Sequence, residues 1–214
     1  AAYSGTFVNQ CAGRNLTFRH FFVVSDPGRA ARIEGDVLYV PVMGGYHNIY
    51  HKTHFVLTTA LDYADFRWII KSDDDTYLCL APYMEEALAG LPGGEWKGLY
   101  GGQLTQRATF LWSHQVDDNY IHHLYGQNYN NAPRDAARAK YGFPFHQGAA
   151  YVLSSDLVRS LTRSAADLAL FRNEDSMVGA WMATRARHVV DIPGDGCSCT
   201  EPRRYSHSLL HSLL

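Results

Sequence analysis

Three adjacent carboxylates, Asp73, Asp74 and Asp75, follow the apolar run 66–70 and the single cation Lys71. Carboxylates this close repel one another, and solvent or a counter-cation must relieve that repulsion. Their oxygens suit Mg²⁺ and Mn²⁺, and open α/β sheets bind ligands at the carboxyl ends of strands. In an extended segment, residues 73 and 75 would point the same way and face one ligand. The motif predicts a divalent-cation site, and the alternative is a solvated acidic turn.

A second acidic pair, Glu174 and Asp175, follows Asn173 at the expected start of a late helix. Two carboxylates can divide roles, one acting as a general base while the other holds a substrate hydroxyl. The helix dipole and N-terminal capping also favour acidic residues here. From these residues alone, both a catalytic pair and a purely structural helix start remain open.

Short apolar runs alternate with helical patterns, and these elements must position the two acidic motifs. Strands are predicted at residues 21–24, 36–40, 66–70, 98–102, 149–153 and 187–191. Helices are predicted at residues 50–61, 82–91, 155–162 and 174–184. The polar and aromatic stretch 104–145 is predicted to be a long functional loop. This alternation predicts an α/β fold with a mixed central sheet flanked by helices, in a single domain.

The composition is typical of a packed domain. Of the 214 residues, 46% are hydrophobic and 19% are charged, and the formal net charge is −2. No run of like charge exceeds three residues, so we expect no nucleic-acid partner. No apolar run approaches the ~18 residues of a membrane span. The four cysteines are too few for a disulfide scaffold, and they do not decide the redox compartment.

Four segments together resemble the β-1,3-galactosyltransferases, glycosyltransferase family 31. Residues 68–80, WIIKSDDDTYLCL, are similar to the family's F-V-x-K-x-D-D-D-x-F-V segment. Upstream, residues 35–38 and 46–53 resemble D-I-L followed by Y-x-N-L-T-L-K-T. Downstream, residues 144–157, PFHQGAAYVLSSDL, resemble P-Y-C-x-G-x-G-Y-V-L-S-x-D-L. Residues 173–181, NEDSMVGAW, resemble x-E-D-V-x-x-G-x-W, so all four blocks occur in the family's order.

The resemblance implies a GT-A-like fold and an inverting, metal-dependent transfer of a hexose from a UDP-sugar to a glycan hydroxyl. Galactose is the expected sugar, transferred in β-1,3 linkage, and UDP-N-acetylglucosamine is the alternative to UDP-galactose as the donor. Residues 179–181 and 196–198 most resemble the branch that galactosylates proteoglycan linker sugars. Family members are type II Golgi membrane proteins, so a Golgi-lumen location is implied, with a membrane anchor ahead of residue 1. The sequon at residues 15–17 agrees with a lumenal protein.

The same resemblance assigns the metal and donor residues. Asp75 takes the position that binds Mn²⁺, with Mg²⁺ as the alternative cation. Asp73 and Asp74 match positions that face the ribose and the donor sugar, and Lys71 matches the lysine ahead of them. His207 is expected to be a further metal ligand near the C-terminus. The partners implied are a UDP-sugar donor and a glycan or glycoprotein acceptor.

Asp175 matches the family's base position, with Glu174 beside it. For two other residues, a simpler interpretation stays open. Lys71 could be a solvated charge at the end of a strand. His207, which we prefer to His211, could be a surface histidine in the tail.

The sequence also departs from the family. Its N-terminal I-R-x-T-W block has no clear counterpart in residues 1–18, so we expect the domain over 1–214 to lack part of the N-terminal strand region. His146 replaces a frequent Cys. Two alternatives remain: a degenerate, non-catalytic sugar-binding domain, or a Mg²⁺-dependent phosphatase, whose strand also ends in Asp-x-Asp. Such phosphatases need Thr or Val where Tyr77 stands.

Overall fold

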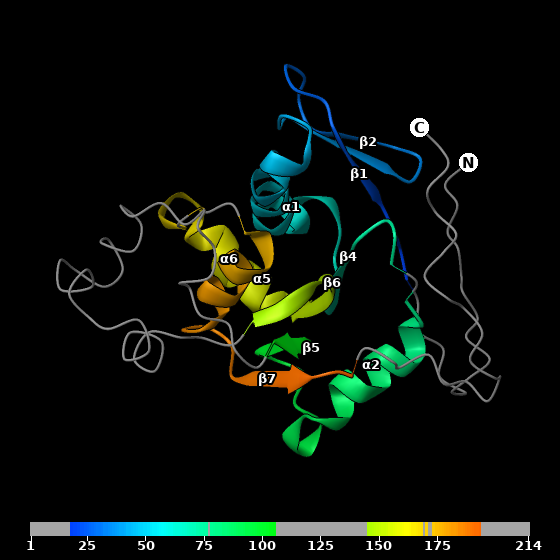
Figure 1. The fold of residues 1–214 in the computed structure, drawn as a ribbon, viewed down its shortest axis with the longest axis vertical. Helices are drawn as coiled ribbons and strands as arrows, with labels where there is room; N and C mark the ends of the chain where they lie inside the picture. Colours follow the sequence, from blue (N-terminus) through cyan, green and yellow to red (C-terminus); the bar gives the residue numbers. More distant parts are fainter. Residues whose placement is uncertain (1–17, 77, 106–144, 169, 171–172, 194–214) are drawn as a thin grey trace.

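The computed structural model describes residues 18–76, 78–105, 145–168, 170 and 173–193 (Figure 1). Its strands are β1 (Phe22–Ser25), β2 (Arg32–Glu34), β3 (Val37–Val40), β4 (Trp68–Ser72), β5 (Leu99–Thr105), β6 (Phe145–Ser154) and β7 (His188–Asp191). Its α-helices are α1 (Ile49–Tyr63), α2 (Leu80–Ala89), α5 (Ser155–Arg163) and α6 (Glu174–Met182). Short 3-10 helices lie at η1 (Tyr46–Asn48), η2 (Pro92–Gly94) and η5 (Ala165–Asp167).

The described strands form two mixed sheets. The first has the order β1-β3-β2, with β1 parallel and β2 antiparallel to β3. The second has the order β4-β6-β5-β7, in which β6 runs antiparallel to both neighbours and β5 runs parallel to β7. The predicted mixed α/β class is therefore confirmed, but these strands divide between two sheets where one central sheet was predicted.

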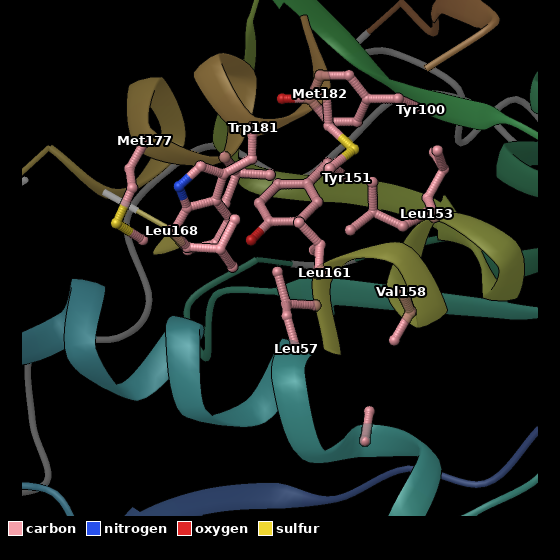
Figure 2. Close-up of a cluster of buried hydrophobic side chains, with 13 residues drawn as sticks. Leu57, Tyr100, Tyr151, Leu153, Val158, Leu161, Leu168, Met177, Trp181 and Met182 are labelled. Atoms are coloured by element: carbon pink, nitrogen blue, oxygen red, sulfur yellow. The ribbon is translucent and has the colours of Figure 1, made fainter. Parts of the chain in front are cut away.

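Helices cover both faces of the four-stranded sheet (Figure 1). Because side chains alternate along a strand, Tyr151 and Leu153 of β6 face the opposite side from Ala150 and Val152. The first pair packs in an apolar cluster with α1, α5 and α6 (Figure 2). The second pair packs against α2 together with Leu99 and other buried residues. From Ala150 to Ser154 both faces of β6 are thus buried, which fixes the register of this part of the strand.

The predicted elements match the observed ones closely. All six predicted strands and all four predicted helices coincide with elements of the same type, while β2 was not predicted. Most of the predicted loop at 104–145 lies outside the described residues, and the described part continues β5 to Thr105 and begins β6 at Phe145. Within the described ranges, no helix combines the length and the apolar character needed to cross a bilayer.

Candidate active site

The two acidic motifs meet at one end of the four-stranded sheet. Strand β4 ends at Ser72, which pairs with Ala150 of β6, and helix α6 packs against β6. The backbone N–H of Asp73 donates to the carbonyl of Ala149 at 3.0 Å. One residue earlier in β6, the N–H of Gly148 donates to Oδ2 of Asp175 at 3.0 Å. The start of β6 therefore lies between the carboxylates that follow β4 and those that begin α6.

Lys71 joins the two motifs through its side chain. Its Nζ donates to Oδ1 of Asp73 at 2.6 Å and to the carbonyl of Gly148 at 2.5 Å. The same ammonium lies 3.4 Å from Oε2 of Glu174. Only 19% of the Lys71 side chain is exposed, so the interpretation as a solvated strand-end charge is wrong.

Glu174 is a buried carboxylate, with 4% of its side chain exposed. The hydroxyl of Tyr151 donates to its Oε1 at 2.6 Å, so each oxygen faces a donor. Burial raises the pKa of Glu174, although Lys71 and the Tyr151 hydroxyl oppose that effect. Burial also disfavours the charged form of Lys71, but Glu174 and Asp73 outweigh it and raise the pKa of the ammonium. The attraction between the two charges thus favours the Lys71–Glu174 pair, while their removal from solvent costs free energy.

At the start of α6, the residue that caps the helix is distinct from the two acidic residues. Asn173 has extended backbone angles, and its Oδ1 accepts from the N–H of Ser176 at 3.0 Å, which is an N-cap. Glu174 instead points to Lys71, and Asp175 accepts from Gly148 on another element. Because Asn173 supplies the cap, capping alone does not explain the two carboxylates.

The Asp73–Asp75 segment is not extended. The N–H of Thr76 donates to the carbonyl of Asp73 at 3.3 Å, which closes a turn with Asp74 and Asp75 in its middle. The expectation that residues 73 and 75 lie in an extended segment and therefore point the same way is wrong. Asp residues favour such turns because their side chains hydrogen-bond to nearby backbone groups. The alternative of an acidic turn is correct in geometry for Asp74 and Asp75, which are exposed, whereas Lys71 fixes Asp73.

The turn exposes two carboxylates of a kind that suits a divalent cation. Asp74 and Asp75 make no hydrogen bond or ion pair with any other described residue, and their hard oxygens fit Mn²⁺ or Mg²⁺. Within the described ranges, no group of three or more His, Cys, Asp or Glu side chains converges. His207 and His211 lie outside the described residues. These two aspartates therefore fit a cation that takes its other ligands from elsewhere.

The sequence alone predicts no functional role for Gly148, Tyr151 or Thr53. Gly148 allows a close approach, because a Cβ there would lie 3.3 Å from Cγ of Asp175. Thr53, a buried residue of α1, hydrogen-bonds to Glu174 and lowers its pKa. All three lie in segments that resemble the family's motifs, which is the only signal that could have singled them out.

Comparison with known proteins gives a consistent set of relatives. The family model described as galactosyltransferase matches residues 28–192. The chain is 27% identical over 169 residues to β-1,3-galactosyltransferase 6 of Mus musculus, covering 74% of this chain and 46% of that protein. It is 27% identical over 150 residues to UDP-GalNAc:β-1,3-N-acetylgalactosaminyltransferase 2 of Danio rerio, covering 70% and 27%. It is 28% identical over 184 residues to a hydroxyproline O-galactosyltransferase of Arabidopsis thaliana, covering 85% and 23%. The chain spans less than half the length of each of these relatives.

Proposed function

The chain belongs to the galactosyltransferase family, and from this premise we propose that it carries the active site of an inverting, metal-dependent UDP-hexose transferase. Galactose is the proposed sugar, transferred in β-1,3 linkage to a glycan hydroxyl. One observation carries the proposal: Lys71 joins Asp73 to Glu174, and Gly148 holds the neighbouring Asp175. A single site therefore contains one carboxylate group suited to the donor and another suited to the acceptor.

Asp175 is the proposed general base. The acceptor hydroxyl must lose a proton as it attacks, and a carboxylate within hydrogen-bond reach can take it. Gly148 orients Oδ2 of Asp175, while Oδ1 makes no hydrogen bond to another described residue. That oxygen is available to accept the proton from the sugar hydroxyl.

Glu174 has a different role in this proposal. Its carboxylate is buried, and its two oxygens face Tyr151 and Lys71. A group enclosed in this way is poorly placed to meet a substrate hydroxyl. Glu174 therefore acts by holding Lys71, which in turn holds Asp73 toward the donor.

Asp75, with His207, is proposed to hold Mn²⁺, and Mg²⁺ is the alternative. A divalent cation held by these residues would supply positive charge to offset the negative charge on the departing UDP. Asp74 and Asp73 face the donor sugar and ribose, where a carboxylate accepts hydrogen bonds from hydroxyl groups. The exposure of Asp74 and Asp75 supports this arrangement, because both carboxylates are accessible to a ligand.

We further propose that the protein acts in the Golgi lumen as part of a type II membrane protein. Cys79 takes part in a disulfide, and disulfides persist in oxidising compartments such as the secretory pathway. Together with the sequon at residues 15–17, this supports a lumenal location. A glycan or glycoprotein is the proposed acceptor.

Transfer assays with Mn²⁺ and with EDTA test the function. UDP-galactose, UDP-N-acetylglucosamine and UDP-N-acetylgalactosamine are each offered with a panel of saccharide acceptors, the last donor because of the relative from Danio rerio. We expect Mn²⁺-dependent release of UDP, fastest with UDP-galactose. Binding of UDP without turnover of any donor would favour the non-catalytic sugar-binding domain. Hydrolysis of a phosphomonoester without sugar transfer would favour the phosphatase.

A further inference from the structure

We propose that Tyr151 is a positioning residue, whose hydroxyl fixes Glu174 so that Lys71 and Gly148 hold the two carboxylate motifs in one arrangement. The inference rests on the proposed function for its effect on sugar transfer. The arrangement itself is a property of the described residues and can be measured separately.

Tyr151 belongs both to the apolar core and to the site. Its side chain is fully buried, and Figure 2 shows its ring in the middle of the core cluster, between Trp181 and Tyr100. Its hydroxyl nevertheless donates a hydrogen bond to Oε1 of Glu174 at 2.6 Å. The ring also lies beneath the ammonium of Lys71, which is 5.6 Å from the ring centroid. A fully buried residue of the apolar core therefore contacts both members of the buried ion pair.

A continuous series of contacts leads from this hydroxyl to both acidic motifs. Tyr151 occupies Oε1 of Glu174, which leaves Oε2 to Lys71 at 3.4 Å. Lys71 then donates to Asp73 and to the carbonyl of Gly148. The N–H of Gly148 in turn donates to Asp175.

The orientation of the Glu174 carboxylate determines this series. The terminal torsion of a glutamate is broad, so the carboxylate plane is set by its hydrogen-bond donors. Tyr151 and Lys71 supply a donor at each oxygen, and Thr53 adds a further contact, so the plane is fixed. Without the Tyr151 hydroxyl, Oε1 is a buried acceptor lacking that donor, and the carboxylate turns toward Lys71. Lys71 then shifts away from Asp73 and Gly148, which loosens both motifs together.

Tyr100 provides a matched control. It is also fully buried in the same cluster, with its ring centroid 6.2 Å from that of Tyr151. Its hydroxyl likewise makes one hydrogen bond, accepting from the N–H of His146 at 3.1 Å. That bond ends on the backbone of His146, and within the described ranges the Tyr100 hydroxyl makes no hydrogen bond to Glu174, Lys71 or Asp175. Tyr100→Phe and Tyr151→Phe thus remove similar hydroxyls from similar surroundings, and only the second removes a contact with Glu174.

The experiment compares these two variants in the full chain. We expect Tm to fall in both variants, and further in Tyr151→Phe, because its hydroxyl donates to a buried carboxylate. For Tyr151→Phe we expect kcat to fall about tenfold or more relative to Tyr100→Phe, because displacement of reacting groups by about 1 Å can cost up to about 100-fold. The KM for the UDP-sugar should rise by a smaller factor than kcat falls, because Asp73 is loosened while the exposed Asp74 and Asp75 are untouched. Amide hydrogen exchange by NMR should be faster at Gly148 and Asp73 in Tyr151→Phe and unchanged in Tyr100→Phe.

Equal kcat values and equal exchange at Gly148 in the two variants would overturn the inference. If the wild-type chain transfers no sugar, the proposed function fails, and the exchange measurement still decides whether Tyr151 holds the motifs. Glu174→Gln gives a second test if Tyr151→Phe does not fold. Its amide keeps an acceptor for Tyr151 but presents a donor to Lys71, so exchange at Gly148 should again be faster. Unchanged exchange in that variant would also refute the inference.

Discussion

Substitution of Lys71 by Met should destabilise the protein in a way that depends on pH. Met matches the length of the lysine stem but removes the charge and its donors. Glu174, with 4% of its side chain exposed, then stays buried but no longer has the Lys71 ammonium beside it. We therefore expect the loss in the free energy of unfolding to be set mainly by the ionisation of Glu174.

The size and sign of the effect follow from the contacts. Removing one partner of a buried ion pair typically costs about 3–5 kcal/mol. Burial already raises the pKa of Glu174, and loss of Lys71, the main opposing group, raises it further. The folded variant then holds a proton that the unfolded chain releases above about pH 4.5, so its stability falls as pH rises through that range. We expect a deficit of about 1 kcal/mol at pH 4.5, from the lost hydrogen bonds to Asp73 and Gly148, and about 2–4 kcal/mol at pH 8.

Urea unfolding of wild type and variant at both pH values measures this deficit. The control is the double variant Lys71→Met with Glu174→Gln, which removes the buried charge as well. At pH 8 the double variant should be about 1–3 kcal/mol more stable than Lys71→Met alone. A deficit that is the same at both pH values would refute the reasoning, as would a double variant no more stable than the single one.

Further substitutions test the residues proposed to contact ligands and the glycine that orients the proposed base. Asp75→Asn should abolish transfer and weaken Mn²⁺-dependent UDP binding in a titration, and unchanged affinity in the folded variant would refute the metal assignment. Asp175→Asn should lower kcat by about 100-fold or more in single-turnover assays while donor affinity stays within a few-fold, and retention of a tenth of the activity would mean that the base lies elsewhere. His207→Ala should flatten the decline in transfer toward about pH 6, where a histidine ligand protonates, and His211→Ala should not; equal effects would mean that the ligand is misassigned. Gly148→Ala should lower kcat several-fold, because its Cβ would lie 3.3 Å from Cγ of Asp175 and displace the proposed base; full activity would show that this close approach is not needed.

Most of the fold could be predicted because its elements carry local signals. Strands β4 and β6 contain apolar runs, and α2 shows one apolar face. Strand β2 has no such signal, because it is three residues long and begins with Arg32. It exists through its pairing with β3, where the Arg32 guanidinium lies 4.1 Å from the Tyr39 ring centroid. The division of the strands between two sheets depends on long-range pairing and could not be predicted either.

The site shows the same contrast between local and long-range information. Asp73–Asp75 and Glu174–Asp175 could be singled out, because acidic residues at the ends of predicted elements suggest chemistry. Their meeting could not, since it depends on the register that places Ser72 opposite Ala150. The apolar run before the triple aspartate predicts that the strand continues through it, whereas these residues form a turn closed at Thr76.

The Lys71–Glu174 pair itself is better explained by position than by stability. Buried ion pairs seldom stabilise a protein more than well-packed apolar residues would. Here burial raises the pKa of Glu174, which opposes its charged form, whereas Glu174 and Asp73 raise the pKa of Lys71 and favour its charged form. Apolar side chains would cost less at this place beside the cluster, but they could not hold Asp73 and the carbonyl of Gly148. The double variant at Lys71 and Glu174 separates the two explanations: recovery of stability with a large loss of kcat means that the pair serves the arrangement of the site, and recovery of both means that it does not.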